Sequence, residues 1–430
     1  MIRIKGGKIV DPGNINGKKD ILIENGFIKD IVDPSISDKE ISYIDSKQDL
    51  TIINAEGMIL TPGLIDMHVH LREPGHEYKE TIETGTRAAA RGGFTTVCSM
   101  PNTDPVNDSS QVTAFIKAKA EKAGYSRVLP VGAISQGLKG VSLAEFGDMK
   151  NAGICAVTDD GQPVENPNLM RKALEYAKGL DIPVLSHAED KAVADNGSMN
   201  EGEVATQLGI KGIANAAESI AVKRDIELAR TTDAKLHICH VSTKESVDAI
   251  RQAKQDGINI TCETAPHYFL LTDEAVRGYN TFAKMNPPLR SEQDRQAIVN
   301  GIADGTIDVI ATDHAPHSQV EKDLEFDRAA FGIIGLETSL ALSLKLVHDG
   351  VISMENLVEK MSKNPGTIIN LKTDIKKNAP ADITIIDPEI EFEIDSSLFF
   401  SKSKNTPFNG YKVKGDTFLT MVKGDIVYEK

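Results

Sequence analysis

The sequence predicts an α/β protein: a (β/α)8 TIM barrel with a small composite β-sandwich domain formed by both chain ends. Three observations support this fold. Apolar, strand-like runs alternate with helical stretches through the middle of the chain, which is typical of βα units around a parallel sheet. Eight such runs can be distinguished, the number that closes a barrel. Short alternating runs broken by Gly and Pro occupy both ends, and neither end has enough strands for a core of its own.

The domain boundaries follow from where this pattern changes. Residues 1–60 carry short alternating runs, and Asn25-Gly26 between two of them predicts a hairpin. Residues 372–430 repeat the same pattern. We therefore expect 1–60 and 372–430 to pair into the composite β-sandwich domain, and 61–371 to form the barrel.

Within the barrel, runs rich in Val and Ile and bounded by turn residues predict the strands, and good helix formers lie between them. An open, doubly wound sheet is the alternative arrangement of the same units. The strands are expected at 58–70, 94–100, 128–134, 153–159, 182–187, 235–241, 259–263 and 307–313. The helices are expected at 81–91, 110–123, 143–151, 168–178, 216–230, 244–255, 291–302 and 337–348, of which 143–151 is the weakest.

Composition narrows the functional classes. The net charge of −15 over 430 residues argues against a nucleic-acid partner, since phosphate binding requires a basic patch. No apolar run reaches the length of a membrane span, and the first residues lack the apolar segment of a secretory signal, so we expect a cytoplasmic protein without a membrane partner. The four cysteines form no C-x-x-C pair; buried free thiols are the preferred interpretation, and metal ligands are the alternative.

The first barrel strand ends in His68 and His70. Alternate residues of a strand point to the same face, so both imidazoles can bind one metal ion. Histidine nitrogen suits zinc and similar divalent metals. Two histidines at a strand end without any ligand are the alternative for this motif taken alone.

Other strands also end in polar residues, and the carboxyl ends of barrel strands meet at one face. Histidines and carboxylates that converge from different strands are what a two-metal hydrolytic site requires. Taken singly, His187 and His237 could be hydrogen-bonded core histidines, Asp313 a helix cap, and His267 a residue that orients a loop. The strand ends are His68, His70 and Arg72; Asn102; Asp159 and Asp160; His187 and Glu189; His237 and His240; Glu263 and His267; and Asp313, His314 and His317.

These strand ends carry a resemblance to a known family. His68, His70, His187, His240 and Asp313 resemble the metal-ligand pattern of the amidohydrolase superfamily, and the finer match resembles the long bacterial, class I type of dihydroorotase. The resemblance covers nearly the whole chain. It rests on Asp66-Met-His-Val-His-Leu-Arg-Glu-Pro-Gly75, Met100-Pro-Asn-Thr103, Thr158-Asp-Asp-Gly161, Asn286-Pro-Pro-Leu-Arg290, Ala311-Thr-Asp-His-Ala-Pro-His317, Phe331-Gly332 and Gly335-Leu-Glu337.

The resemblance implies a metal-dependent cyclic amide hydrolase. The implied reaction is the reversible cyclisation of N-carbamoyl-L-aspartate to L-dihydroorotate plus water, through a metal-bound hydroxide, in de novo pyrimidine (UMP) biosynthesis. The implied cofactor is zinc, as one or two divalent ions per subunit. The implied metal ligands are His68, His70, Asp160, His187, His240 and Asp313, with Asp313 also the catalytic base. The implied substrate-binding residues are Arg72, Asn102, Asn286, His317, Phe331 and Gly332.

One departure from the superfamily matters. Many relatives bridge two metals with a carboxylated lysine at the end of strand four, where this chain has Asp159 and Asp160. This favours the bacterial dihydroorotase branch over another cyclic-amide hydrolase, a hydantoinase (dihydropyrimidinase) or allantoinase. A catalytically inactive relative acting as a scaffold is the remaining alternative, disfavoured because no metal-ligand position is missing. We expect a homodimer, with aspartate carbamoyltransferase as a candidate associated enzyme.

Overall fold

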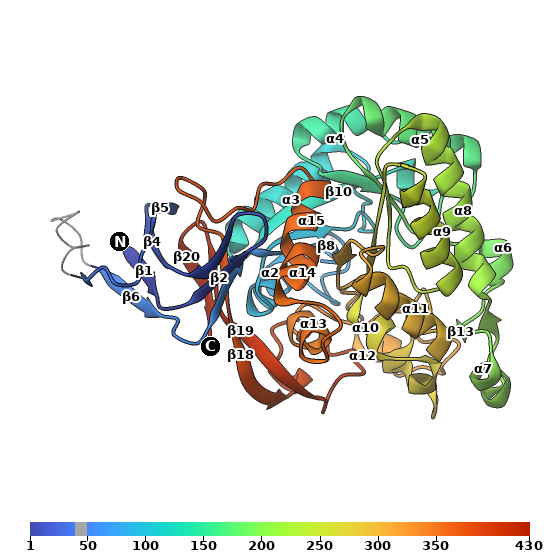
Figure 1. Ribbon diagram of the computed structural model, residues 1–430. Coiled ribbons are helices and arrows are strands. Elements are labelled where there is room, and N and C mark those ends of the chain that lie inside the picture. Colours follow the sequence, from blue (N-terminus) through green and yellow to red (C-terminus); the bar gives the residue numbers. More distant parts are fainter. Residues whose placement is uncertain (39–49) are drawn as a thin grey trace.

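The central feature of the protein, a computed structural model that describes residues 1–38 and 50–430, is a ring of eight parallel strands (Figure 1). They follow one another in chain order, and the first and last meet through a parallel bridge between Val69 and His314, where His70 N donates to His314 O at 2.9 Å. The closed ring confirms the barrel, because a doubly wound sheet reverses its strand order. The strands are β8 (Leu64–Val69), β9 (Phe94–Ser99), β10 (Arg127–Ala133), β11 (Ala156–Thr158), β12 (Val184–Ser186), β15 (Leu236–Ile238), β16 (Ile260–Thr264) and β17 (Val309–Ile310).

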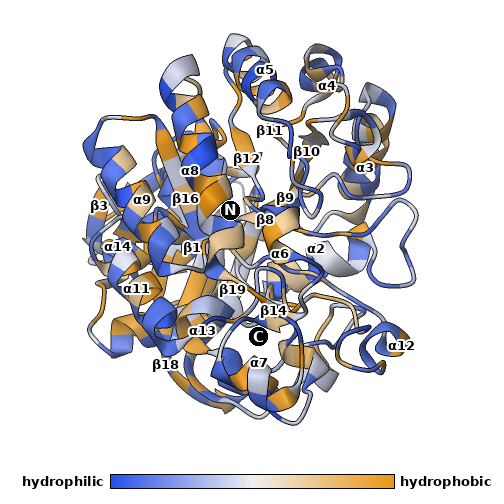
Figure 2. Ribbon diagram, turned by 90° about the vertical axis from the view of Figure 1, so that its right-hand side faces the viewer, coloured by the Kyte–Doolittle hydropathy of each residue, from blue (hydrophilic) through white to orange (hydrophobic). Residues whose placement is uncertain are grey.

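Helices follow the strands as predicted and surround the ring. Figure 2 shows orange strands such as β12 inside helices that carry both orange and blue residues, the pattern of a helix with one buried face. Local signals set the helix ends: α5 begins at Pro167 after Asn166, whose side chain accepts from two backbone amides. The main helices are α2 (Ile82–Arg91), α3 (Ser110–Ala123), α4 (Phe146–Ala152), α5 (Pro167–Gly179), α8 (Asn215–Thr232), α9 (Lys244–Gln255), α11 (Glu292–Ala303) and α13 (Ser339–His348).

Shorter elements lie in the connections. The weakest predicted helix, near 143–151, exists as α4, whereas the pairs β13/β14 and α6/α7 between β12 and α8 were not predicted. The shorter elements are α6 (Lys191–Ala194), β13 (Met199–Asn200), α7 (Glu203–Leu208), β14 (Gly212–Ile213), α10 (Pro266–Leu270), α12 (Gln319–Lys322), α14 (Met354–Val358), a π-helix (Glu359–Lys363), α15 (Asn364–Ile368), and 3-10 turns at Gln136–Leu138, Asp273–Val276, Thr281–Ala283 and Ser396–Leu398.

The first predicted strand, 58–70, was wrong in one respect: it is two strands in two different sheets. The chain passes from β7 (Ile59–Pro62) to β8 at Gly63, whose amide donates to Asp382 O at 3.0 Å. A Cβ at Gly63 would lie 2.1 Å from Thr95 Oγ1, so only glycine allows the close approach there. The apolar pattern runs unbroken across the junction because both strands are buried.

Both chain ends build the second domain, as predicted. Its six-stranded sheet has the order β20-β19-β18-β7-β2-β3, and its four-stranded sheet has the order β5-β4-β1-β6. β18 pairs with β7 antiparallel, with Ile383 opposite Pro62, which joins the two ends of the chain. These strands are β1 (Ile2–Lys5), β2 (Lys8–Asp11), β3 (Ile15–Lys18), β4 (Asp20–Glu24), β5 (Phe27–Val32), β6 (Thr51–Asn54), β18 (Ile383–Glu393), β19 (Lys412–Val422) and β20 (Asp425–Glu429).

The core of this domain is a cluster of buried aliphatic side chains from both ends, among them Ile4, Ile21, Leu60, Ile383 and Leu419. The predicted boundaries at 60/61 and 371/372 stay a prediction. Residues 39–49, which fall within the predicted segment 1–60, lie outside the described residues.

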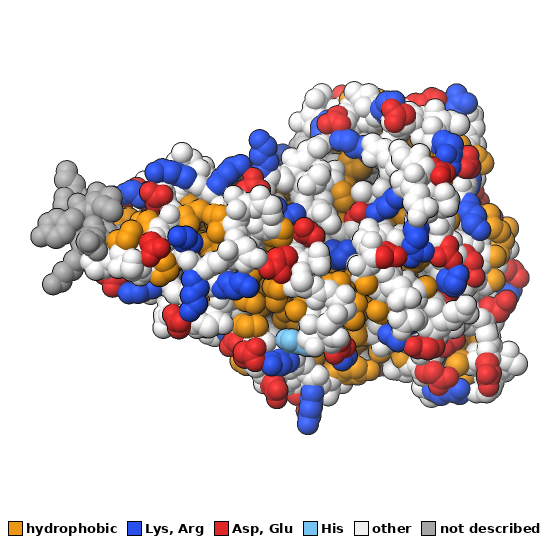
Figure 3. Space-filling view, viewed as in Figure 1, with side chains coloured by type: hydrophobic (Ala, Val, Ile, Leu, Met, Phe, Trp, Pro, Cys, Tyr) orange, Lys and Arg blue, Asp and Glu red, His pale blue; other side chains and the backbone are white. Residues whose placement is uncertain are grey.

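The thiols agree with the compositional expectation of buried free cysteines, and the visible surface carries charges of both signs. Lys and Arg side chains are interspersed with Asp and Glu on the face shown in Figure 3. No helix within residues 1–38 and 50–430 combines the length and apolar character needed to cross a membrane. The four cysteines, Cys98, Cys155, Cys239 and Cys262, are buried free thiols.

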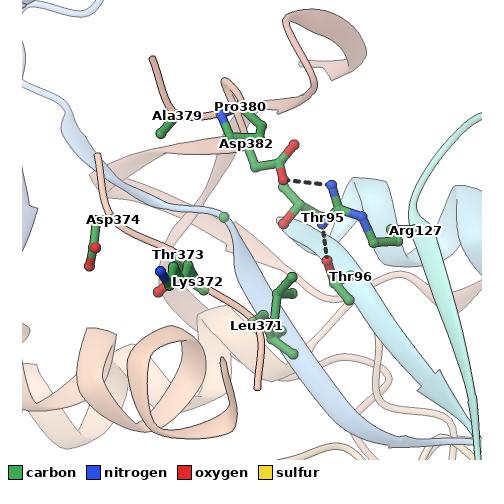
Figure 4. Close-up of a pocket in the computed structure, with 12 residues that line it drawn as sticks. Thr95, Thr96, Arg127, Leu371, Lys372, Thr373, Asp374, Ala379, Pro380 and Asp382 are labelled. Atoms are coloured by element: carbon green, nitrogen blue, oxygen red, sulfur yellow. Dashed lines mark hydrogen bonds and ion pairs between the residues drawn. The ribbon is translucent and has the colours of Figure 1, made fainter. Parts of the chain in front are cut away.

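The barrel and the sandwich meet at a small cavity of about 30 Å³ (Figure 4). On its wall Arg127 of β10 pairs with Asp382 at 2.8 Å and donates to Thr96 Oγ1 at 3.0 Å. The other carboxylate oxygen of Asp382 accepts from Lys423 N at 2.7 Å. A single carboxylate therefore connects a barrel strand to the β19–β20 turn.

We expect Asp382→Ala to lower the free energy of unfolding by about 1–3 kcal/mol, because it leaves Arg127 and the Lys423 amide without their partner. Chemical denaturation followed by circular dichroism measures this. Asp425→Ala, an exposed position on β20, is the control and should stay within about 0.5 kcal/mol of the unchanged protein. Equal midpoints for the two variants would contradict the proposed role of the junction.

Candidate active site

Two histidines and one carboxylate meet where the barrel closes. His68 lies on β8 and His70 directly follows that strand, while Asp313 follows β17. Asp313 Oδ1 is 3.1 Å from His70 Nε2 and 3.5 Å from His68 Nε2. The three residues present ligand atoms within 4.8 Å of one another. The strand alternation inferred from the sequence thus brings both imidazoles to the same carboxylate.

Asp160, after β11, stands at the centre of the cluster. Its Oδ1 lies 3.3 Å from His68 Nε2, 3.3 Å from His187 Nδ1 and 3.6 Å from His240 Nε2. Its Oδ2 lies 3.5 Å from His70 Nε2. The neighbouring Asp159 points away and accepts from Ile134 N and Ser135 N instead. Of the two aspartates at this strand end, only Asp160 can join the two histidine pairs.

The second pair consists of His187 after β12 and His240 after β15. Their facing nitrogens, His187 Nδ1 and His240 Nε2, are 2.8 Å apart. His240 and Asp313 both have positive φ, 34° and 47°. Such backbone strain in residues with side chains clusters at functional sites.

The residues fit a divalent metal centre. The ring and carboxylate atoms that face the centre of the cluster include His68 Nε2 and Asp160 Oδ1, which are buried without a hydrogen-bond partner within the described structure. Buried polar atoms without partners are costly unless a ligand satisfies them. Three groups among the described residues have metal-ligand spacing: His68 with Asp160 and His240, His68 with His70 and Asp313, and His68 with Cys239 and Glu263. Imidazole and carboxylate donors are the set that zinc and similar ions bind.

The electrostatics point the same way. Burial opposes the charged forms, but the neighbouring imidazoles outweigh it and lower the pKa of Asp160 well below its usual range and that of Asp313 less strongly. Burial likewise opposes a charge on His68, and the two aspartates still raise its pKa. Ionised carboxylates buried in the barrel mouth require a nearby cation, and a bound metal would supply it.

Further side chains orient the ligands. His68 Nδ1 donates to Glu263 Oε1 at 2.6 Å, and His70 Nδ1 donates to Asn102 Oδ1 at 2.9 Å. A partner on Nδ1 fixes the tautomer that presents Nε2 to a metal. Glu263 was given no role from the sequence. Its position at the end of the seventh strand, beside the other strand-end residues, was the feature from which one could have been inferred.

Two residues outside the predicted site hold strands together beneath it. Asp66 accepts from His68 N and Thr312 N, both at 3.1 Å, and from Thr312 Oγ1 at 2.5 Å. Burial raises the pKa of Asp66 to about 7. His237 lies 2.8 Å from Thr261 Oγ1 and 3.3 Å from Glu263 Oε2, so it is the hydrogen-bonded core histidine that the sequence left open.

A cavity of about 360 Å³ opens over the ligands. Of the residues expected to bind substrate, all but Gly332 line it. Arg72 donates to Pro316 O at 3.1 Å and lies 3.3 Å from His317 Nε2. The neighbouring Glu73 pairs with Lys119 at 2.8 Å, so the charge of Arg72 is not neutralised by Glu73. The wall includes Arg72, Asn102, Asn286, His317 and Phe331, together with His70, Asp160, His187, His240 and Asp313.

Gly332 lies behind the wall. Its amide donates to Lys284 O at 2.9 Å, and its carbonyl accepts from Asn405 Nδ2 at 3.0 Å and Lys322 Nζ at 3.1 Å. A Cβ there would lie 2.7 Å from the His317 ring. At Gly332, therefore, the backbone groups that were predicted to contact substrate already bond to Lys284, Asn405 and Lys322.

His317 is held neutral. Burial and the nearby charges of Arg72 and Lys79 lower its pKa to about 2. Lys79 Nζ lies 3.4 Å from His317 Nδ1 and pairs with Glu321 at 2.7 Å. The imidazole can thus give or accept hydrogen bonds toward an anion, while the positive charge comes from Arg72 and Lys79.

Comparisons with known proteins agree with this geometry. A family model described as Dihydro-orotase-like matches residues 57–246. The chain is 61% identical to a curated dihydroorotase of Desulforapulum autotrophicum, over 100% of this chain and 99% of the relative, and 54% identical to one of Geobacter metallireducens, over 99% of each. Among solved structures, an L-hydantoinase (dihydropyrimidinase) from Arthrobacter aurescens matches with a TM-score of 0.87 and 25% identity, over 100% of this chain and 96% of that chain.

A closed (β/α)8 barrel with a composite sandwich and clustered imidazoles and carboxylates at its mouth defines a metal-dependent enzyme of the amidohydrolase superfamily. Identity of 61% over the full length carries the assignment further. The chain belongs to the dihydroorotase family.

We expect Glu263→Gln to weaken metal binding about 10- to 100-fold, because the His68 ring loses the carboxylate that fixes its tautomer. Competition against a chromophoric chelator measures the affinity. The matched control is Glu337→Gln, a buried carboxyl that accepts from Phe400 N outside the metal cluster. An unchanged affinity in Glu263→Gln, or an equal loss in both variants, would refute this role.

Proposed function

We propose that this enzyme is a dihydroorotase, which interconverts N-carbamoyl-L-aspartate and L-dihydroorotate plus water in de novo pyrimidine (UMP) biosynthesis. The observation that carries the proposal is the position of Arg72, Asn102 and His317 on the wall of the cavity that holds the clustered histidines and aspartates. L-dihydroorotate is a cyclic amide with a carboxylate on its ring, so it needs an anion-binding group beside the hydrolytic centre. Full-length relatives named dihydroorotase support the same reaction.

We assign one or two divalent ions per subunit, zinc foremost, to His68, His70, Asp160, His187, His240 and Asp313. Such an ion, when bound, activates water and polarises an amide carbonyl. His68, His70 and Asp313 would hold one ion, His187 and His240 the second, and Asp160 would lie between them. Asp160 is suited to this place because its Oδ1 is within 3.6 Å of a ring nitrogen of His68, His187 and His240.

Asp313 is the proposed catalytic base. It accepts the proton of the attacking water and delivers it to the ring nitrogen that leaves when the amide opens. Its carboxylate lies 3.1 Å from His70 Nε2 and lines the cavity, which supports this role. In the biosynthetic direction the same carboxyl group takes a proton from the ureido nitrogen and returns it to the departing oxygen.

The chain's own residues bind the substrate. The guanidinium of Arg72 matches a carboxylate in its planar fork, and Asn102 and His317 complete the anion site. Asn286 and the Phe331-Gly332 backbone would contact the ring. Since the Gly332 amide already donates to Lys284 O, Phe331 and Asn286 are the better placed of these three.

A hydantoinase-like activity is the second candidate, because solved structures with that name share the fold. Two features favour dihydroorotase. No lysine lies among the described residues that line the cavity, whereas the family resemblance gives hydantoinases a carboxylated lysine bridge. The cavity also offers Arg72, which a substrate without a ring carboxylate does not need. An inactive scaffold is disfavoured because each of the proposed metal-ligand positions carries a side chain that can bind a metal.

We further propose a cytoplasmic homodimer with small-molecule substrates and no nucleic-acid or membrane partner. Aspartate carbamoyltransferase, which makes N-carbamoyl-L-aspartate, is a candidate for association. The acidic balance of the chain, −15 overall, supports the absence of a nucleic-acid partner.

Removing the metal should abolish turnover, and adding zinc or a similar divalent ion should restore it, because the clustered histidines and aspartates alone cannot activate water. The measurement is carbamoyl-aspartate cyclisation before chelation, after chelation and after metal return, with metal content determined in each sample. Added bicarbonate should make no difference, since Asp160 stands where relatives carry the carboxylated lysine. Full activity in a metal-free sample would overturn the proposal.

Asp313→Asn should keep most of the metal but lose about 10²–10⁴-fold in kcat, because the amide retains an oxygen donor and cannot accept the proton. Steady-state rates and metal content are measured on the same preparation. Turnover within about tenfold of the unchanged enzyme would exclude Asp313 as the base. Asp159→Asn, whose carboxylate faces away from the cluster, serves as the control.

Arg72→Met should lower kcat/KM for L-dihydroorotate about 10²–10³-fold, because a buried carboxylate loses its charged partner. Hydrolysis of dihydrouracil, which lacks the carboxylate, should change little. Steady-state kinetics on both substrates decide this, with Arg251→Met on the outer helix α9 as control. An equal loss on both substrates, or a preference of the unchanged enzyme for dihydrouracil, would favour the hydantoinase-like candidate.

A further inference from the structure

The connection between β18 and β19 leaves the sandwich and lies against the barrel near the active site. Three anchors hold it there. Phe400 N donates to the Glu337 carboxylate at 2.7 Å, Ser401 Oγ to Glu80 Oε2 at 2.5 Å, and Ser403 Oγ to Lys79 O at 2.7 Å. Glu80 and Lys79 belong to the segment between β8 and α2, directly after the His68 and His70 strand.

Asn405, in the same connection, makes an unusually complete set of bonds. The residue is 2% exposed. Nδ2 donates to Ala315 O and to Gly332 O, each at 3.0 Å, and Oδ1 accepts from His317 N at 3.1 Å. Its backbone carbonyl accepts from Ile334 N at 3.0 Å. An amide side chain with two donors and one acceptor in use leaves no part of the group free to shift.

These bonds join two separate walls of the substrate cavity. Ala315 and His317 belong to the loop after β17. Phe331 and Gly332 belong to the segment between α12 and α13, called here the return segment. Ala315, His317 and Phe331 all line the cavity. Gly332 also packs so closely on this loop that a Cβ would lie 2.6 Å from Ala315 O. The two segments also pair directly, since Ala315 N donates to Ile333 O at 2.9 Å. Asn405, a side chain from outside the barrel's own βα units, adds the bonds that hold His317 N and Gly332 O beside this pairing.

We propose that Asn405 is a positioning residue for substrate binding: it fixes His317 and the Phe331-Gly332 segment at the separation that the carboxylate and ring of the substrate require. This inference rests on the proposed dihydroorotase function. Asn405 lies behind the wall and is not itself a catalytic residue. The β-sandwich domain, through its β18–β19 connection, thus contributes to substrate affinity.

The physical reason is the cost of losing the amide. Without Nδ2, the carbonyls of Ala315 and Gly332 are buried with one donor fewer, and the two segments stay joined through Ala315 N and Ile333 O but lose their restraint at His317 and Gly332. Gly332 O keeps Lys322 Nζ at 3.1 Å, so the return segment is loosened but not released. The metal ligands have other supports, Glu263 for His68 and Asn102 for His70, so loosening this wall leaves the metal cluster in place.

The test uses Asn405→Asp and Asn405→Leu in the full-length, metal-loaded enzyme. Asp keeps the acceptor for His317 N but turns an oxygen toward two carbonyls, and Leu keeps the volume without any bond. Both variants should raise KM for L-dihydroorotate about tenfold or more while kcat stays within about threefold, consistent with the loss of one or two hydrogen bonds. Metal content should not change.

The matched control is Asn364→Asp. Asn364 does not line the substrate cavity, and the change removes a similar amide donor, whose Nδ2 lies 2.9 Å from Asp308 O. Its melting temperature should fall with KM unchanged, which separates a loss of stability from a loss of positioning. Calorimetric titration with L-dihydroorotate gives the affinity independently of turnover. Should Asn405→Leu fail to fold, Asn405→Asp still decides the question.

Unchanged KM and affinity in a folded Asn405 variant would overturn the inference, as would an equal rise in Asn364→Asp or a fall in kcat with KM unchanged. These outcomes are distinct from failure of the proposed function. That failure appears in the unchanged enzyme, as absent turnover of L-dihydroorotate with metal bound.

Discussion

The buried carboxylate of Asp160 among four imidazoles is the interaction on which the site depends. A carboxylate in a barrel interior is costly without a counter-charge, yet Asp160 keeps its pKa well below the usual range because His68, His187 and their neighbours offset its burial. A bound cation would offset the free-energy cost of burying the charges of both Asp160 and Asp313. The strand ends bring a ring nitrogen of His68, His70, His187 and His240 within 3.3–3.6 Å of the Asp160 carboxylate.

The cluster is held by hydrogen bonds on the side of each ring that faces away from the metal ligands' common centre. Glu263 and Asn102 fix the tautomers of His68 and His70, and Asp66 joins β8 to Thr312 at the closing strand. Satisfied buried polar networks of this kind give a rigid geometry, and partly satisfied ones are unstable. The positions of the metal-binding nitrogens of His68 and His70 therefore depend on the hydrogen bonds made by Nδ1 of each ring.

The sandwich contacts the barrel at two places, and one of them is the wall of the active-site cavity. Arg127 and Asp382 connect the two domains at the cavity shown in Figure 4, and the β18–β19 connection reaches the cavity walls through Asn405. One of the other anchors of this connection, the carboxyl group of Glu337, is buried enough that its pKa rises to about 7. A domain formed from both chain ends thus lies against one side of the barrel and supports a loop at its mouth.

The sequence by itself determined the eight strands, the composite sandwich and which residues would meet. Strand periodicity gives the direction of each side chain, and closure of a parallel ring brings every strand end to one face, so the histidines and carboxylates of the strand ends could be grouped without coordinates. The resemblance to the amidohydrolase superfamily then singled out His68, His70, Asp160, His187, His240 and Asp313 among them. Only the tertiary structure decided what lies between distant segments. The break at Gly63, the partner of His68 in Glu263 and the reach of Asn405 depend on three-dimensional packing. Periodicity specifies which face a residue occupies and carries no information about the neighbour it meets across the fold.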